Sequence, residues 1–297
     1  MRKKTGTLMC RSLFFILYLY VVMSKSSVFI IATIATIALC GGCRVRQERP
    51  SVNSVYPKAK NVTRIVQYNV GVFSKEIENS IPMISSMMKE IGADAISLNE
   101  LDSCNARHPN NQIKDFSEEM GGWNHKFGRA MPFRDGAYGV GVVVPDKIED
   151  SFVIALPQGN GLEPRACAVV ETKGYVLAST HLDYKDEPSI VVQAQTINKE
   201  LAGKYSQTKK PVFLAGDMNS IPGSAVLNEL AKRWDVISCR KNTFSAVNPH
   251  ECIDFILVLR NGAKVEVVAS DVPAEFETGE VGTASDHLPI FVDVKLR

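Results

Sequence analysis

Six short stretches of this sequence place acids, amides or histidines within or directly after an apolar run. Asn69 ends RIVQYN, and Glu100 ends AISLNE. The other four carry His181 and Asp183 after VLAST, Asp217 and Asn219 after VFLAG, Asp254 within CIDFILVL, and Asp286 with His287 before LPIFVDV. A charge in such an apolar stretch is costly unless it is paired or bound to a metal. The six stretches therefore predict one polar centre of paired charges or metal ligands.

The spacing of these residues supports that interpretation. In an extended chain, residues two apart point to the same side, so Asp217 and Asn219 present two polar groups to one site. A simple turn from a strand to a helix does not require both of them before Pro222. Single positions have plainer explanations: a turn at Asn69, the start of a polar loop at Glu100, a satisfied core histidine at His181 and a turn cap at Asp183. Their joint occurrence favours a functional centre.

A framework of strands and helices must position these residues. The β-branched runs predict strands near 63–70, 94–98, 138–144, 166–171, 175–180, 211–215, 252–259, 265–269 and 289–294. Apolar residues at helical spacing predict helices near 78–91, 112–120, 188–205 and 224–233. Such interleaving indicates an α/β (α+β) protein. Because strands outnumber helices by about two to one, two packed sheets with outer helices fit better than one doubly wound sheet.

The polar motifs, in this order and spacing, resemble the endonuclease/exonuclease/phosphatase family. That family includes pancreatic deoxyribonuclease, apurinic endonucleases, inositol-polyphosphate phosphatases and bacterial sphingomyelinases. The most specific motifs are GDMN at 216–219 and SDHLP at 285–289, supported by LNELD at 98–102, EPR at 163–165, THLD at 180–183 and IDFIL at 253–257. The resemblance covers about 64–294. It implies a four-layer α/β sandwich, with two packed mixed β-sheets flanked by helices, and a metal-dependent phosphodiesterase or phosphatase.

The resemblance also implies a metal site. Glu100 matches the family's principal metal ligand, with Asn69 and Asp286 near the ion. Oxygen ligands of this kind suit Mg²⁺ or Mn²⁺, which keep several waters and bridge to the substrate phosphate. We therefore expect Mg²⁺ or Mn²⁺ as the cofactor.

The remaining roles follow from the same resemblance. Asp217 would orient or deprotonate the attacking water, and Asn219 would hold a phosphate oxygen. His287, backed by Asp254, matches the family's carboxylate-paired histidine, whose charged ring the carboxylate favours. His181 would stabilise the transition state or protonate the leaving oxygen. The phosphate-binding residues would be Arg165, Asn219 and His181, and Tyr138 matches a strand start that borders the site in relatives or simply packs.

Several positions depart from the family pattern and bear on the substrate. Asn99 stands where Gln usually precedes the metal-binding Glu, and Gly71 stands where some nucleases carry an acid. Ile190 replaces a frequent Arg, and His250 with Glu251 lies where basic residues are frequent. A less basic rim fits a small or lipid phosphoester at least as well as a polynucleotide.

The N-terminus predicts export. An apolar run at 28–39 is shorter than the roughly 18–20 residues that span a bilayer and ends in small residues, as a signal peptide does. The following LCGGC resembles a bacterial lipidation site, with Cys43 favoured over Cys40, while plain secretion and an uncleaved anchor are alternatives. We expect 1–43 to be the export segment, 44–60 a polar tether and 61–297 the enzyme domain. The protein would be a membrane-anchored lipoprotein or periplasmic or extracellular.

The net charge of the chain bears on the class of substrate, while several functions stay open. Five of the 34 basic residues precede residue 44, so the remainder has 29 basic and 32 acidic residues, a net charge of about −3. Dedicated nucleic-acid binders carry many Lys and Arg contacts, which this balance does not favour. A nuclease, a sphingomyelinase-like lipid phosphodiesterase, a sugar- or inositol-phosphate phosphatase and a non-catalytic ligand-binding module on the same fold stay open. Membrane attachment is expected, and no protein partner is implied.

Overall fold

The computed structural model describes residues 55–296. The export segment expected at 1–43, with Cys43, and the first part of the expected tether lie outside the described residues. Within residues 55–296, no helix is both long and apolar enough to cross a membrane.

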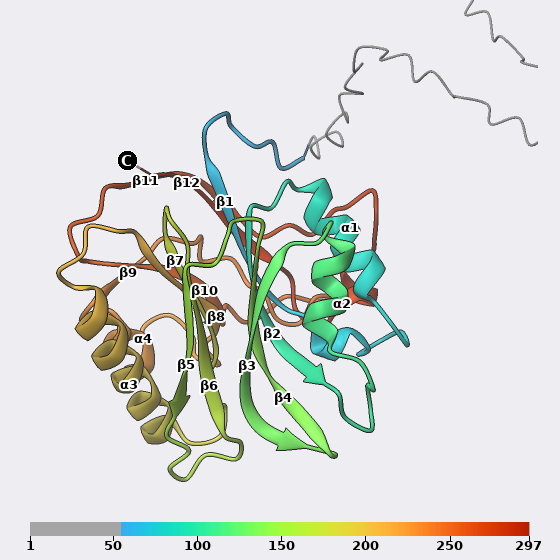
Figure 1. The fold of residues 1–297 in the computed structure, drawn as a ribbon, viewed down its shortest axis with the longest axis horizontal. Helices are drawn as coiled ribbons and strands as arrows, with labels where there is room; N and C mark the ends of the chain where they lie inside the picture. Colours follow the sequence, from blue (N-terminus) through green and yellow to red (C-terminus); the bar gives the residue numbers. More distant parts are fainter. Residues whose placement is uncertain (1–54, 297) are drawn as a thin grey trace, which may run out of the picture. The chain divides into compact units, whose positions relative to one another are not determined.

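Two mixed sheets of six strands form the centre of the described part of the chain (Figure 1). The first has the order β11 (Val265–Asp271), β12 (Ile290–Leu296), β1 (Thr63–Asn69), β2 (Ala95–Ser103), β4 (Gly136–Val144) and β3 (Asn124–Phe133). The second has the order β5 (Asp150–Leu156), β6 (Arg165–Glu171), β7 (Val176–His181), β8 (Val212–Asp217), β10 (Asp254–Leu259) and β9 (Trp234–Val236).

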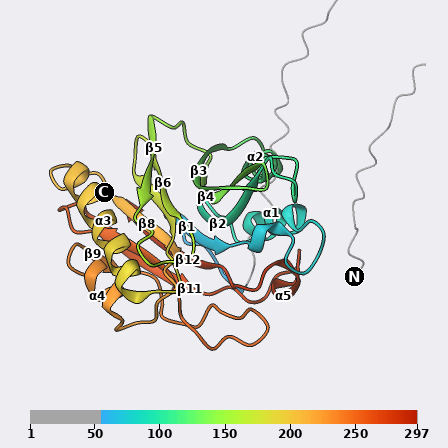
Figure 2. The ribbon, with the colours of Figure 1, turned by 90° about the horizontal axis from the view of Figure 1, so that it is seen from below.

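Helices cover the outer face of each sheet. Helices α1 (Ile81–Glu90) and α2 (Gln112–Glu119) lie beside the first sheet, and α3 (Glu187–Tyr205) and α4 (Ala225–Leu230) lie beside the second (Figures 1 and 2). A short 3₁₀ helix (Gly71–Phe73) follows β1, and the four-residue α5 (Val281–Ala284) precedes β12.

Three groups of buried apolar side chains hold these layers together. One lies between the first sheet and its helices, and another lies between the second sheet and its helices. The third fills the space between the sheets, with Ile65, Leu177, Phe213 and Ile290 fully buried. The described residues therefore form the four-layer α/β sandwich, and the fold prediction is confirmed.

The sequence of α3 explains its start and its orientation. The Asp186 carboxylate accepts a hydrogen bond from the backbone N–H of Ser189 at 3.0 Å, which caps the helix. Buried Ile190, Ala194, Ile197 and Leu201 recur at three- and four-residue spacing and so lie on one face. That face packs on the second sheet.

Strand register brings the polar stretches to one edge of the sandwich. The parallel pair β1 and β2 aligns Asn69 with Asn99, and the parallel pair β7 and β8 aligns His181 with Asp217. Antiparallel β10 starts beside the end of β8, where Asp254 is opposite Asp217. Carboxyl ends from both sheets thus surround one location, as the sequence predicted.

The sequence patterns missed β3, β5, β9 and α5. Strands β3, β5 and β9 are edge strands of their sheets, and several of their residues are exposed. An edge strand with one solvated face lacks the continuous apolar run that marks a central strand.

The folded unit extends further toward the N-terminus than expected. Tyr56 is buried, and its hydroxyl accepts hydrogen bonds from the backbone N–H groups of Ala274 and Glu275. The buried Arg64 donates to the Tyr56 carbonyl at 2.9 Å and to Asp293. The last part of the segment expected as a tether, from Tyr56 onward, therefore packs into the domain, which starts before residue 61.

Candidate active site

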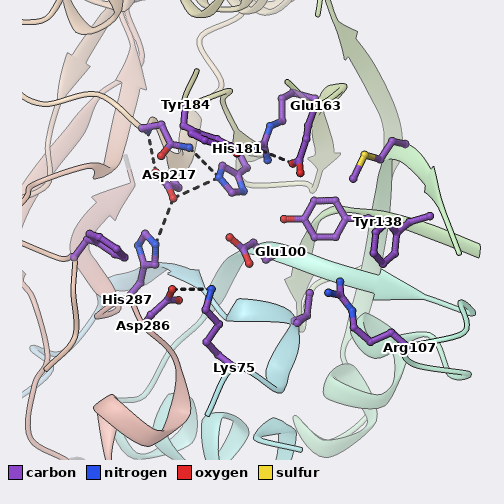
Figure 3. Close-up of a pocket in the computed structure, with 16 residues that line it drawn as sticks. Lys75, Glu100, Arg107, Tyr138, Glu163, His181, Tyr184, Asp217, Asp286 and His287 are labelled. Atoms are coloured by element: carbon purple, nitrogen blue, oxygen red, sulfur yellow. Dashed lines mark hydrogen bonds and ion pairs between the residues drawn. The ribbon is translucent and has the colours of Figure 1, made fainter. Parts of the chain in front are cut away.

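A cavity of about 550 Å³ opens where the carboxyl ends of the strands meet (Figure 3). Residues from both sheets line it, including Glu100, Arg165, His181, Asp217 and His287. Asp217 and His287 lie at one end of the close-up view in Figure 3, and Arg107 lies at the other end.

Asp217 is a buried carboxylate at the inner end of this cavity. Its Oδ1 accepts a hydrogen bond from the Asn219 backbone N–H at 2.9 Å, and its Oδ2 accepts one from Asn69 Nδ2 at 3.1 Å. Burial and the negative charge of Asp254 raise the pKa of Asp217 to about 7, although the His287 charge lowers it. A carboxylate with a raised pKa can take a proton from water near neutral pH.

His287 and Asp254 form a buried pair. His287 Nδ1 lies 2.9 Å from Asp254 Oδ2, which also accepts a hydrogen bond from the Thr243 hydroxyl at 2.6 Å. Burial alone would lower the pKa of His287, but the neighbouring charges of Asp254, Asp217 and Asp286 raise it to about 9. The ring is therefore a cation at neutral pH, with Nε2 3.6 Å from Asp217.

Asp217, Asp254 and His287 also form the only three-residue group among the described His, Cys, Asp and Glu side chains whose ligand atoms are close enough for a metal ion. A protonated imidazole has no lone pair to offer a metal, and His287 already lies between the two carboxylates. The arrangement therefore suits proton transfer and charge stabilisation better than metal binding, since two carboxylates face one cationic ring.

Glu100 enters the cavity from an irregular position in β2. Its backbone is in the left-handed region, with φ 58°, where the pairing of β2 with β4 shifts register. This bulge turns the partly exposed carboxylate out of the ladder and toward the cavity. Asn69 Nδ2 donates to Glu100 Oε1 at 3.2 Å, which joins the ends of β1 and β2.

Asp286 lines the same cavity and is paired with a cation. Lys75 Nζ lies 2.9 Å from Asp286 Oδ2. Burial alone would lower the pKa of Lys75, but the hydrogen bond and charge of Asp286 and the charge of Glu100 raise it. The two acids thus share one anionic region that Lys75 partly neutralises.

His181 and Asn219 lie together above Asp217. Asn219 Nδ2 donates to His181 Nε2 at 3.0 Å and to the Leu182 carbonyl at 2.9 Å. Burial and the charges of Arg165 and His287 lower the pKa of His181 well below 6.5, so the ring is neutral. Because Nε2 accepts, the proton is on Nδ1, which is buried without a hydrogen-bond partner among the described residues.

Arg165 is buried beside His181. Its Nη2 lies 3.2 Å from Glu163, and its Nε has no hydrogen-bond partner among the described residues. Tyr138 also lines the cavity, and burial with the nearby charge of Glu100 raises its pKa well above 10. Arg165 and Tyr138 therefore present a cation and a neutral hydroxyl to the cavity.

Asn99 holds the inner end of the site in place. Its side-chain oxygen accepts hydrogen bonds from the Asp217 backbone N–H at 2.8 Å and from Gln67 at 2.6 Å, and its Nδ2 donates to the Thr180 carbonyl at 2.9 Å. The residue that departs from the family pattern thus links β2 to β7 and β8.

The side chains present fit a hard divalent cation. Glu100 and Asp286 line the cavity and offer carboxylate oxygens, which Mg²⁺ and Mn²⁺ prefer, and Asn69 lies behind Glu100, to which its amide donates. The region is anionic apart from Lys75, so a cation there would relieve repulsion between the carboxylates.

The active-site residues predicted from the sequence lie in or directly behind this cavity. Asp183, which belongs to one of the polar stretches, lies outside it. Asp183 is buried and accepts backbone N–H groups of Glu163 and Lys185. The patterns missed Lys75, Arg107, Phe133, Tyr184 and Phe244, which also line the cavity. They come from loops or an edge strand, where no spacing separates a cavity residue from an ordinary surface residue.

Comparisons with known proteins add to this geometry. A model of the Endonuclease/Exonuclease/phosphatase family matches residues 66–287. No curated protein sequence matches the chain.

Similar solved structures share the fold. One is an endonuclease/exonuclease/phosphatase from Bacteroides vulgatus, with 18% identity and a TM-score of 0.65 over 80% of this chain and 100% of that one. A mannosyl-6-phosphatase from Bacteroides thetaiotaomicron has 18% identity and a TM-score of 0.64 over 78% and 99%. ANGEL2, a 2',3'-cyclic phosphatase, has 14% identity and a TM-score of 0.63 over 80% and 97%.

Proposed function

Because the chain belongs to the endonuclease/exonuclease/phosphatase family, whose members are hydrolases acting on phosphoesters, we propose that it is a metal-dependent phosphoester hydrolase. One observation carries the proposal. The buried Asp217 carboxylate, with its raised pKa, lies 3.5 Å from His181 Nε2 and 3.6 Å from His287 Nε2, and lines the same cavity as Glu100. The proposed base Asp217, the cationic ring of His287 and the proposed metal ligand Glu100 thus line one cavity.

The reaction follows from these positions. Asp217 accepts a proton from a water molecule, whose oxygen forms a bond to phosphorus while the bond to the leaving oxygen breaks. The proton then passes to the leaving alkoxide, so that an alcohol and a phosphate are released. A divalent cation, which Glu100 would hold with Asn69 and Asp286 near it, would supply neutralisation of the phosphate charge.

The other side chains stabilise charge as it develops. The His287 cation, which Asp254 maintains, lines the cavity next to Asp217, and Arg165 adds a second positive charge there. His181 is neutral and lines the cavity, so its ring can contact a phosphate or leaving oxygen without carrying charge.

A small phosphoester is the substrate class that we favour. The net charge of about −3 over residues 44–297 gives no general attraction for a polynucleotide. One similar structure is named as a mannosyl-6-phosphatase, and a mannose phosphate is a small phosphoester. The substrate panel below distinguishes a phosphodiesterase from a phosphomonoesterase.

The test is hydrolysis by residues 44–297 of p-nitrophenyl phosphate, bis-p-nitrophenyl phosphate, inositol phosphates, sphingomyelin and plasmid DNA, with Mg²⁺, Mn²⁺ or EDTA. Asp217→Ala and His287→Ala should abolish turnover, whereas Asp235→Ala, an exposed acid distant in the fold, should not. A folded protein that turns over none of these substrates would instead favour the binding module.

We also propose that the enzyme is exported and membrane-anchored through Cys43. The apolar run at 28–39 and the adjacent LCGGC support this. Cell fractionation with labelled palmitate tests it: the full chain should incorporate label in the membrane fraction, and Cys43→Ser should not. Label retained by Cys43→Ser but lost from Cys40→Ser would move the site to Cys40.

A further inference from the structure

Arg107 forms the wall of the cavity opposite the catalytic end. It comes from the loop between β2 and α2, and its side chain is one third exposed. Figure 3 places it at the far end of the view from Asp217 and His287, beyond Tyr138. The proposed chemistry does not use it.

The guanidinium is held in a fixed orientation. Arg107 Nε and Nη2 donate to the two oxygens of Asp102 at 2.7 and 3.0 Å. Asp102 is fully buried and also contacts His108 Nδ1 at 2.6 Å. The side-chain oxygen of Asn105 accepts the backbone N–H groups of Arg107 and His108, which fixes the loop itself.

An aromatic ring lies against the same guanidinium. Arg107 Cζ lies 4.7 Å from the centre of the Phe133 ring, and Arg134 Cζ lies 5.3 Å from it. Phe133 and Tyr138 are 6.3 Å apart, and both line the cavity. Arg107 is therefore preorganised by an ion pair and a stacked ring.

Asp102 uses two of the five guanidinium N–H donors, so three stay available. Nη1 has no hydrogen-bond partner among residues 55–296, because Asp102 occupies only the Nε and Nη2 edge. An oriented arginine with free donors at a cavity wall matches the flat geometry of a carboxylate or phosphate.

We propose that Arg107 is a specificity-determining residue that binds a second oxyanion of the substrate, a phosphate or a carboxylate, while the reacting phosphoester lies at Asp217. This inference rests on the proposed hydrolase function. It narrows the substrate class to small molecules with two anionic groups.

The charge distribution favours one second anion and not a polyanion. The acids Glu100, Asp217 and Asp286 line the catalytic end, where a divalent cation would offset them, whereas Arg107 supplies the positive charge at the far end. On the other side of Arg107, the next cavity is lined by Glu78 and Asp115. A polynucleotide continuing past Arg107 would meet these carboxylates.

The test is calorimetric binding to the full chain in excess Mg²⁺, using ligands that cannot be hydrolysed. Propylphosphonate carries one anionic group, phosphonopropionate adds a carboxylate, and propane bisphosphonate adds a second phosphonate. We expect one or both of the two-anion ligands to bind about tenfold more tightly than propylphosphonate, as a hydrogen bond to a charged group allows. If phosphonopropionate gains more affinity over propylphosphonate, the second anionic group of the substrate is a carboxylate. If propane bisphosphonate gains more, it is a phosphate.

Variants assign the gain to Arg107. Arg107→Gln should reduce the ratio of affinities to about one, and Arg107→Lys should keep part of it, since the charge remains. Arg134→Gln makes the same charge change beside the same ring, outside the residues lining the cavity, and should keep the full ratio.

Three results would overturn the inference: equal affinities for all three ligands, no binding of any, or an unchanged ratio in Arg107→Gln. Metal-dependent hydrolysis of bis-p-nitrophenyl phosphate is measured on the same sample. Hydrolysis without discrimination rejects the role of Arg107 and retains the hydrolase. Discrimination without any hydrolysis rejects the hydrolase and leaves a binder of two anions.

Discussion

His287 Nδ1 lies 2.9 Å from Asp254 Oδ2 inside the protein, where neither residue has appreciable exposure. The contact keeps a positive charge on a buried imidazole. Asp254 is held in place next to it, because Thr243 and Gln67 also donate to its two oxygens. The pair therefore supplies a fixed cation beside Asp217.

The first prediction concerns the titration of His287 in the metal-free protein. NMR of its ring should give a pKa near 9, and Asp254→Asn should bring the pKa below 6.5, because burial then outweighs the remaining charges. A folded pKa above the unfolded value stabilises the fold below pH 6.5, and this contribution is lost as pH rises through about 9. The difference in the free energy of unfolding between wild type and Asp254→Asn should therefore decrease as the pH rises from 6.5 to about 9. A His287 pKa near 6.5 in wild type would contradict this.

The second prediction concerns the base. Asp217→Asn keeps the size of the side chain but cannot accept the proton of water, so kcat should fall by about a thousandfold. Mg²⁺ affinity should change little, because Glu100 is intact. Calorimetry and near-ultraviolet circular dichroism separate this outcome from unfolding. A loss of less than about tenfold would remove Asp217 from the role of base.

The sequence predicted the central strands of the two sheets better than the edge strands. Central strands such as β7 and β8 are buried on both faces, so their apolar runs are continuous and end visibly at His181 and Asp217. Strand β3 is an edge strand that is part-exposed along nearly its whole length, and its sequence carried no such signal. A strand buried on both faces requires a continuous apolar run, which can be recognised in the sequence. A partly exposed strand does not require one.

The same difference explains the site. Asn69, Asp254 and His287 could be identified because burying a polar group within an apolar run costs free energy unless the group has a partner or binds a metal. Lys75 and Arg107 come from polar loops, where a charged residue is ordinary, and only the folded structure brings them to the cavity. The positive φ of Glu100 was also beyond the sequence, since it depends on the bulge between β2 and β4.

The third prediction concerns the start of the domain. Tyr56→Ala removes a buried ring and the acceptor for two backbone N–H groups, so the free energy of unfolding should fall by about 3 kcal/mol. Lys60→Ala, an exposed residue in the same segment, should change it by less than about 0.5 kcal/mol. Urea denaturation measures both. Equal stability of the two variants would mean that residues before 61 do not contribute to the fold.

The last prediction separates backbone strain from charge at Glu100. Its φ of 58° places a side-chain-bearing residue in the left-handed region, which costs about 1 kcal/mol that glycine does not incur. Glu100→Gly and Glu100→Ala both remove the carboxylate, so both should lose Mg²⁺ binding by calorimetry. Without metal, Glu100→Gly should be more stable than Glu100→Ala by about 1 kcal/mol in urea, because alanine retains the strained backbone. If alanine is as stable as glycine, the bulge carries no strain. If either variant still binds Mg²⁺ with wild-type affinity, the ion is held elsewhere in the cavity.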